Sequence, residues 1–285
     1  IAIVLRAQGK YDEAMTMYER ALEVKTKALG PDHASVGETL NNMAIVLDAQ
    51  GKYDEAMAMY ERALEVHTKA LGPDHTSVGK TVNNMAIVLD VQGKYDEAMA
   101  MYERALEVHT KALGPDHPSV GETLNNMANV LKEQGKYDEA MAMYERALEV
   151  KTKALGPDHT SVGNTLNNIA NLLEPQGKYD EAMAMYERAL EVHTKALGPD
   201  HASVGDTLNN MAMVLRAQGK FDEAMAMYER ALEIETKALG PDHASVGNTL
   251  GNMANLLEAQ GEYDEAMAMY ERALEVHTKA LGPDH

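Results

Sequence analysis

The sequence predicts an all-α solenoid of antiparallel helix hairpins, and three observations predict it. The chain repeats itself with a period of 42 residues, and each complete period contains two stretches of apolar residues at helical spacing. Each period also ends in Gly-Pro-Asp-His, a sequence that stops a helix. A fixed period of this length is typical of a solenoid, in which every unit packs only against its neighbours.

The repeat divides the chain into six complete units and one incomplete unit, which we treat as a single array over residues 1–285. The first unit, residues 1–33, lacks its first nine positions. Because the chain begins inside a first helix and ends after a second one, without a polar capping helix, we expect a longer array. The complete units are residues 34–75, 76–117, 118–159, 160–201, 202–243 and 244–285.

The first helix of each unit, called helix A, is predicted near residues 33–50 of the unit that begins at Ala34. A Gln-Gly-Lys sequence at 50–52 interrupts the pattern and ends the helix. Gly37 lies inside this helix at a cost of about 1 kcal/mol relative to alanine. We expect close approach of the preceding second helix to explain the glycine, with flexibility at the helix start as the alternative. The apolar face of helix A consists of Val36, Leu40, Met43, Ala44 and Leu47.

The second helix, called helix B, is predicted near residues 53–71. Asp54 and Glu55 lie in its first turn, where the helix dipole favours acids. Gly72 and Pro73 follow its last turn and end it. The apolar residues of helix B that recur at helical spacing are Ala56, Met59, Tyr60, Ala63, Leu64, Ala70 and Leu71.

The segment "LNNMAIVLDAQGKYDEAMAMYERALE" resembles the tetratricopeptide repeat, with small residues at Ala44, Ala56 and Ala63 and an aromatic residue at Tyr60. The longer unit with "ALGPDH" is similar to the repeats of kinesin light chains and of the sensor arrays in fungal NOD-like (STAND) receptors. The resemblance covers the whole chain. It implies a right-handed superhelix in which helix A lines the concave surface.

The units are nearly identical, and most of their differences lie on one face of helix A. The positions of Ala34, Glu38, Ile45, Asp48 and Ala49 vary between units and project within an arc of about 100°, away from the apolar stripe. Helix B varies repeatedly at one position, which reads Lys, His, His, Lys, His, Glu, His along the chain. These residues are Lys25, His67, His109, Lys151, His193, Glu235 and His277, called here the helix-B column. Because the column exchanges charged and polar types, we expect it to be exposed to solvent.

We predict that the varied residues of helix A and a ladder of adjacent asparagines form a ligand-binding groove. The asparagine amides can pair with the backbone of an extended peptide, and the varied residues would select its side chains. Two alternatives stay open: this face is the one that packing constrains least, and the amides cap or bridge neighbouring helices. The predicted ligand-binding residues are Glu38, Asn41, Asn42, Ile45, Asp48, Lys80, Asn83, Asn84, Ile87, Asp90, Glu122, Asn125, Asn126, Asn129, Lys132, Asn164, Asn167, Asn168, Asn171, Glu174, Asp206, Asn209, Asn210, Met213, Arg216, Asn248, Asn252, Asn255 and Glu258.

Charge and composition exclude several classes of partner. A net charge of −19 argues against nucleic acids and anionic membranes, which require basic surfaces, and favours a protein or peptide partner. The absence of cysteine suits a cytoplasmic protein and excludes disulfides and thiol nucleophiles. Gly79-Lys80-Thr81 looks like the end of a phosphate-binding loop, but six residues separate Gly72 from Gly79, and no other unit carries the lysine. We therefore predict no nucleotide binding.

We also predict no catalytic residues, no metal site and no cofactor. Seven of the eleven histidines belong to turns spaced one repeat apart, too distant from one another to share an ion. An active site is needed once, and the residues that occur once do not converge: Lys80, Glu133, Pro175 and Gly251. Pro175 is expected to kink its helix A locally, because it removes a donor and crowds the carbonyl of Asn171.

The function that these observations favour is recognition of a protein or peptide by the sensor segment of a larger receptor. A cargo adaptor resembling kinesin light chain is the first alternative, and a structural or self-assembling spacer is the second. Uncovered terminal faces predict end-to-end stacking of molecules at high concentration.

Overall fold

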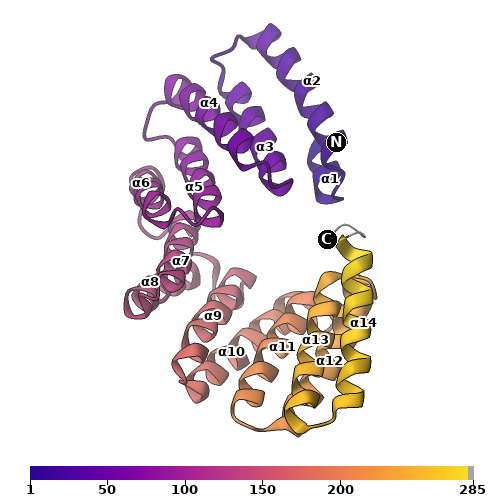
Figure 1. Cartoon of the computed structure of the whole chain (residues 1–285). Coiled ribbons are helices and arrows are strands. Elements are labelled where there is room, and N and C mark those ends of the chain that lie inside the picture. Colours follow the sequence, from indigo (N-terminus) through magenta and orange to yellow (C-terminus); the bar gives the residue numbers. More distant parts are fainter. Residues whose placement is uncertain (282–285) are drawn as a thin grey trace. The chain divides into compact units, whose positions relative to one another are not determined.

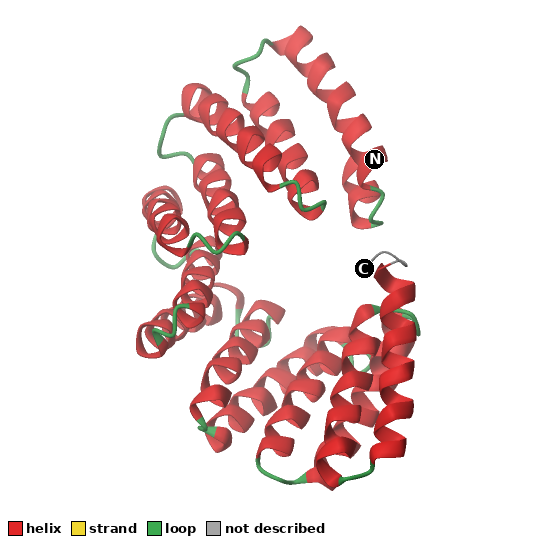
Figure 2. Cartoon of the chain, viewed as in Figure 1, coloured by secondary structure: helices red, strands yellow, loops and turns green. Residues whose placement is uncertain are grey.

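The structure is a computed structural model that describes residues 1–281, and the Gly-Pro-Asp-His end of the last unit lies outside the described residues. All elements among these residues are helices joined by short loops (Figures 1 and 2). The chain divides into two units of structure, Ile1–Val150 and Lys151–His285. The helices A are α1 (Ala2–Ala7), α3 (Ala34–Ala49), α5 (Thr76–Val91), α7 (Pro118–Glu133), α9 (Thr160–Leu173), α11 (Ala202–Ala217) and α13 (Ala244–Gln260). The helices B are α2 (Tyr11–Leu29), α4 (Tyr53–Leu71), α6 (Tyr95–Leu113), α8 (Tyr137–Leu155), α10 (Tyr179–Leu197), α12 (Phe221–Leu239) and α14 (Tyr263–Leu281).

The predicted hairpin of two helices per repeat is confirmed, with boundaries within one residue of those expected in the repeat that begins at Ala34. Gly72 ends α4 with a φ of +89°, a conformation that other residues adopt only with strain. In the six turns that the structure describes in full, the histidine caps the following helix A, a role that the sequence did not indicate. The Nδ1 atom of His75 accepts a hydrogen bond of 3.1 Å from the backbone N–H of Ser77 and so caps the start of α5.

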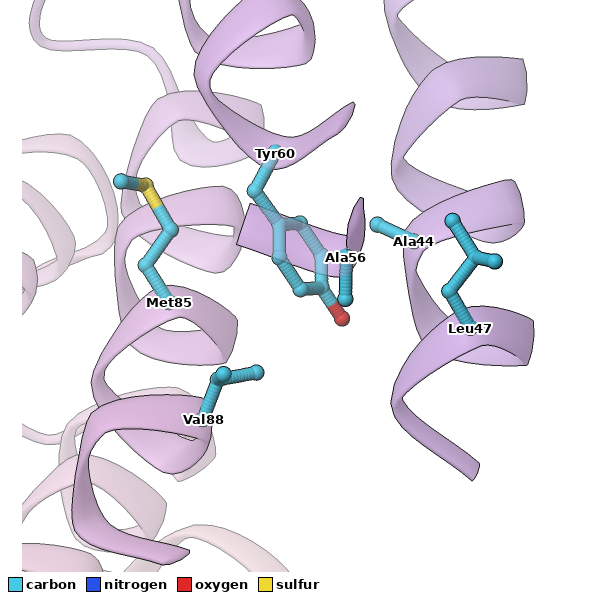
Figure 3. Close-up of a cluster of buried hydrophobic side chains, with 6 residues drawn as sticks. All are labelled: Ala44, Leu47, Ala56, Tyr60, Met85 and Val88. Carbon is cyan, nitrogen blue, oxygen red and sulfur yellow. The ribbon is translucent and has the colours of Figure 1, made fainter. Parts of the chain in front are cut away.

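A buried tyrosine from helix B belongs to each of the core clusters that join one repeat to the helix A of the next. Figure 3 shows Tyr60 of α4 with Ala44 and Leu47 of α3 on one side and Met85 and Val88 of α5 on the other. Ala44 and Ala56 are fully buried, and their small side chains let the helices approach closely enough to enclose the ring. Equivalent clusters surround Tyr102 in the first unit and Tyr228 in the second. Each repeat therefore completes its core with helix A of the next repeat.

The glycine inside helix A faces a helix other than the one expected. A Cβ atom on Gly37 would lie 2.5 Å from Cδ2 of His67, which belongs to helix B of the same repeat and not of the preceding one. The equivalent atom on Gly205 would lie 2.8 Å from Cγ of Glu235. Close approach is thus the reason for the glycine, as predicted, but the partner helix was assigned wrongly.

Pro175 disrupts its helix A, as predicted. The α-helix α9 ends at Leu173, and a single 3₁₀ turn, η1 (Glu174–Gln176), replaces its last residues. The side-chain amide of Gln176 donates a hydrogen bond of 2.6 Å to the carbonyl of Leu172. A tighter turn accommodates the proline where a continuous α-helix would place its ring against a carbonyl.

Candidate functional site

Two clefts of the first unit bring together residues of successive helices A. One cleft of about 300 Å³ is lined by residues of α3, α5 and α7 together with His109, and the other, of about 230 Å³, by residues of α3 and α5 together with His67. Lys80 belongs to both clefts. The larger cleft, called cleft 109, contains Asn41, Ile45, Lys80, Asn83, Asn84, His109, Ser119, Glu122 and Thr123. The smaller cleft, called cleft 67, contains Glu38, Asn41, Asn42, His67, Ser77, Lys80 and Thr81.

The position of Glu38 is the most accessible of the predicted site positions. It is exposed in all six complete repeats, where it holds Glu38, Lys80, Glu122, Asn164, Asp206 and Asn248. In the first unit its charge alternates from negative to positive to negative. Loss of hydration raises the pKa of Asp206, which lies near His201 and His243. A ligand that contacts the position of Glu38 in several repeats would therefore meet a different side chain in each of them.

The asparagine ladder also links neighbouring helices A to one another. Asn41 is hydrogen-bonded to Thr81 at 3.3 Å and to Asn84 at 3.4 Å, both in the following repeat. In the second unit Asn209 is likewise hydrogen-bonded to Thr249 at 3.3 Å and to Asn252 at 3.1 Å. Bridging by these amides, left open by the sequence, is thus present. Asn41 nevertheless lines both clefts of the first unit.

The position of Ile45 contributes to the core in three repeats. Ile45, Ile87 and Met213 pack against the tyrosine clusters. Where the position holds asparagine, the amide oxygen accepts a hydrogen bond from the tyrosine hydroxyl of the same repeat. The bonded pairs are Tyr144 with Asn129, Tyr186 with Asn171, and Tyr270 with Asn255. An apolar residue at this position packs against the tyrosine cluster, and an asparagine forms a hydrogen bond with the tyrosine hydroxyl. The sequence did not indicate that the variation has this structural cause.

The position of Asp48 places charges at the half-buried end of helix A. Burial raises the pKa of Asp48 and of Asp90, and for Asp90 the nearby Glu133 adds to the increase while Lys132 opposes it. Lys132 forms an ion pair of 3.1 Å with Glu133. Glu174, Arg216 and Glu258 occupy this position in the second unit, where the carboxylate of Glu258 lies 2.9 Å from the hydroxyl oxygen of Tyr270 and competes with Asn255 for its proton.

Five of the seven residues of the helix-B column are buried and the other two, Lys25 and His277, are partly buried, so the expectation that the column is exposed to solvent is wrong. His67, His109, Lys151, His193 and Glu235 are each at most 5% exposed. Each lies against the glycine of its own helix A or the threonine of the next one, and the polar atoms bond to that threonine. The bonds are Lys25 to Thr39 at 2.8 Å, His67 to Thr81 at 3.2 Å, His109 to Thr123 at 3.2 Å, Lys151 to Thr165 at 3.0 Å, His193 to Thr207 at 3.3 Å, and Glu235 to Thr249 at 2.8 Å.

His67 and His109 are site residues that the sequence analysis missed. Both line a cleft, and burial lowers the pKa of each imidazole. The available signal was Thr39, which lies beside the apolar stripe of helix A and is a threonine in every complete repeat. A polar residue that is constant on a buried face requires a hydrogen-bonding partner, and the column supplies it.

Residues 1–281 contain no group of three or more His, Asp or Glu side chains placed to hold a metal ion. Within the same range, no helix is both long and apolar enough to span a membrane.

Several solved structures share the fold. The crystal structure of BtubC (BKLC) from P. vanneervenii is 22% identical, with a TM-score of 0.67 over 79% of this chain and 91% of that chain. A Podosopora anserina putative kinesin light chain with nearly identical TPR-like repeats is 23% identical, with a TM-score of 0.60 over 72% and 97%. The apo form of RapI is 17% identical, with a TM-score of 0.69 over 98% and 95%. At these identities the likeness shows the fold alone.

A family model covers nearly the whole chain. No curated protein sequence matches this chain. The tetratricopeptide repeat model, in contrast, matches residues 1–69, 39–107, 77–153, 119–193, 161–237 and 203–279. Together with the helix hairpins, the buried tyrosines and the fully buried alanines, this match shows that the chain belongs to the tetratricopeptide repeat family.

Proposed function

We propose that the helix-A face binds a protein or peptide ligand. The observation that carries the proposal is the composition of clefts 67 and 109. Both lie between successive helices A; Glu38 and Lys80 line cleft 67, and Lys80 and Glu122 line cleft 109. These three residues differ among repeats that are otherwise nearly identical. Tetratricopeptide repeats are typical protein-interaction scaffolds, which agrees with this assignment. Alternating charge at these three positions would favour ligands of complementary charge and reject others.

The proposal has a wider form, in which residues 1–285 act as one array and as the sensor segment of a larger NOD-like receptor in the cytoplasm. Binding takes place there without catalysis and without a cofactor. The fold likeness to a putative kinesin light chain supports a second candidate, a cargo-adaptor array. A spacer is the third candidate, and it alone requires no ligand on the helix-A face. A nucleotide-binding domain elsewhere in the full-length protein would favour the sensor, and a heptad coiled coil would favour the adaptor.

A comparative capture experiment tests the binding face. The bait is the array, and the test variant is Glu38→Asn/Lys80→Asn/Glu122→Asn, which gives these repeats the residue that Asn164 provides in another repeat. We expect the variant to lose the partners that the unchanged array retains from a native lysate, as measured by quantitative mass spectrometry. The three side chains are exposed, so their exchange leaves the core intact.

The matched control carries the same change in charge on helix B, in the variant Glu61→Asn/Arg62→Asn/Glu103→Asn. These residues are also exposed, and none of them lines either cleft. The control is expected to retain the partners. Equal retention by all three baits would contradict binding at the helix-A face and support the spacer.

Self-association is a separate expectation for the terminal repeats. Tyr263, Met267 and Leu274 of α14 are more than half exposed, whereas their counterparts Tyr53 and Met57 pack against a core cluster. A second copy of the chain could cover this apolar surface. We expect sedimentation velocity to show concentration-dependent association that Met267→Glu weakens. Monomers alone up to millimolar concentration would refute it.

A further inference from the structure

His109 is a buried titratable side chain at the place where one repeat of the first unit packs against the next. It extends from α6, lies against Gly79 of α5 and is hydrogen-bonded to Thr123 of α7, the helix A of the following repeat. The contact between α6 and α7 around this ring is called joint 109. Because α5, α6 and α7 all meet at the imidazole, a change in its protonation acts on the packing between the two repeats.

The protonated ring of His109 would have one N–H without an acceptor. The hydroxyl of Thr123 has two acceptors for its proton, the carbonyl of Ser119 at 3.0 Å and Oδ1 of Asn83 at 3.3 Å. Its oxygen therefore accepts a hydrogen bond from Nδ1 of His109 at 3.2 Å. Nε2 is fully buried and has no hydrogen-bond partner among the described residues. Protonation adds an N–H at Nε2, and an unpaired buried donor is costly, above all when it is charged.

The charged groups around His109 also oppose its protonation. Burial lowers its pKa, and the nearby His117 of the turn and Lys80 of α5 lower it further. Glu122 of α7 lines the same cleft but makes no hydrogen bond to Nε2. Lys80 is the one basic residue at its position among the six complete repeats. The unfavourable charge beside the ring is therefore particular to this repeat.

The corresponding joint of the second unit, called joint 193, accommodates a protonated ring. His193 extends from α10, which has the same sequence as α6. Its Nε2 lies 3.0 Å from Oδ1 of Asn164, and its Nδ1 lies 3.3 Å from the hydroxyl oxygen of Thr207. Asn164 has the position on α9 that Lys80 has on α5, and the next helix A carries an acid in both joints, Asp206 in this one. Each N–H of an imidazolium at joint 193 thus has an oxygen within hydrogen-bond distance.

Backbone groups also favour the proton at joint 193. Burial lowers the pKa of His193, but the carbonyls of Thr160 and Ser203 oppose the decrease, while His201 adds to it. At His109, in contrast, both neighbours that act on the pKa oppose the proton. The two joints therefore differ in their response to acid although their helices B are identical.

His67 is intermediate between these two histidines. Its Nε2 is also without a hydrogen-bond partner among the described residues, and burial lowers its pKa. Glu38 of α3 opposes the decrease, as does the carbonyl of Ala34, whereas His75 adds to it. An acid on its own helix A thus offsets part of the cost that Lys80 increases at joint 109.

We propose that joint 109 is acid-labile and that Lys80 makes it so. With lysine at this position, the ring has no acceptor for a second proton and faces a second positive charge. With asparagine, as at joint 193, it has an acceptor. The open joint takes up a proton that the closed joint excludes, so acid favours opening. Because residues on both sides of the joint line cleft 109, opening takes this cleft apart. The device goes beyond the proposed function, since it requires no ligand.

The pH window follows from the direction of the shift. In the open joint the imidazole titrates near its ordinary pKa of 6.5, and in the closed joint burial holds the pKa of His109 lower. The contribution of the neutral ring to the closed joint is therefore present above pH 6.5. It is lost progressively as the pH falls from 6.5 through the lower pKa of the folded state. At pH 5 the loss reaches at most about 30-fold in the closing equilibrium.

Hydrogen exchange of the α7 amides in the intact chain, followed by mass spectrometry, measures the opening of joint 109. The sequence of α7 occurs once, so its peptides are distinct from those of other helices. Protection is compared at pH 8 and pH 5 after correction for the intrinsic effect of pH on exchange. We expect protection of α7 to fall roughly tenfold more in the parent than in Lys80→Asn. His117 accepts a hydrogen bond from the N–H of Ser119, and acid removes this cap in parent and variant alike.

Two further variants test the two residues separately. His109→Gln has no imidazole to titrate and should remove the excess loss in α7, whatever its effect on stability at pH 8. Asn164→Lys is the reciprocal exchange and should create an excess loss in α11, relative to a parent in which Glu235 acts on α11 equally. An equal loss in the parent and Lys80→Asn, an excess that persists in His109→Gln, or an unchanged α11 in Asn164→Lys would each overturn the proposal.

Discussion

Replacement of Glu235 with glutamine is expected to stabilise the protein by about 3 kcal/mol at pH 8 and to have little effect at pH 4. Glu235 is 1% exposed on α12 and lies against Gly205 and Thr249. Burial is the main cause that raises its pKa from the ordinary 4.5 to about 7; nearby Asp206 raises it further, and the hydrogen bond from Thr249 opposes the increase.

The sign follows from the proton that the folded state retains. Below pH 4.5 both states are protonated and the contribution of Glu235 is complete. As the pH rises from 4.5 to about 7, the unfolded chain loses the proton first, so stability falls over this window. Above about pH 7 the carboxylate is ionised in both the folded and the unfolded state, and the stability that protonated Glu235 contributed has been lost completely. Glutamine keeps the size and the hydrogen bond to Thr249 without this loss.

The measurement is the difference in unfolding free energy between variant and parent from urea titrations at several pH values. A difference is needed because burial lowers the pKa of His67, His109 and His193, whose contributions change with pH in the opposite direction. Hydrogen exchange of the α12 amides locates the effect, since repeat arrays open locally. Glu229→Gln, on the exposed side of α12, is the control. A pH-independent difference would show that the raised pKa is wrong.

Replacement of Gly79 with alanine is expected to destabilise the protein by about 1–3 kcal/mol, even though alanine is the better helix former by about 1 kcal/mol. The added Cβ would lie 2.5 Å from Cδ2 of His109 and 3.2 Å from Cγ1 of Val108. His109 is buried and bonded to Thr123, so its ring cannot move aside without losing that bond. The overlap therefore outweighs the gain in helix propensity.

Denaturant unfolding of a double-mutant cycle separates the overlap from other effects. His109→Ala removes the ring, and in that background Gly79→Ala should be neutral or stabilising. Gly251→Ala is the matched control, because a Cβ on Gly251 of α13 meets nothing within 4 Å. That control should be stabilised by up to about 1 kcal/mol. A cost for Gly79→Ala that persists without His109 would show that the imidazole is not the cause.

Local patterns in the sequence determined most of the fold. The apolar spacing of Leu40, Met43 and Leu47 and the Gly72-Pro73 stop depend only on neighbouring residues, so the helix boundaries and the repeat could be predicted. The alanines and the tyrosine of the core could be placed for the same reason. Pro175 disrupts α9 through its own ring, an effect that also requires no knowledge of distant residues.

The candidate site was predicted in part. The exposure of Glu38 and its counterparts follows from their place opposite the apolar stripe, and the structure groups Glu38, Lys80 and Asn41 around a cleft. The amide bridge from Asn41 to Asn84 could be stated only as an alternative. Whether an amide meets a ligand or the next helix depends on the distance between helices A, which helical periodicity does not contain.

Only the tertiary structure decided that the helix-B column is buried. Variation from Lys to His to Glu indicates exposure in a single helix, because charged groups are costly to bury. Here Gly37 leaves room for the side chain and Thr81 of the next repeat bonds to it, so three different residues fit one buried position. The three partners come from three helices and two repeats, and their meeting is a consequence of packing between repeats.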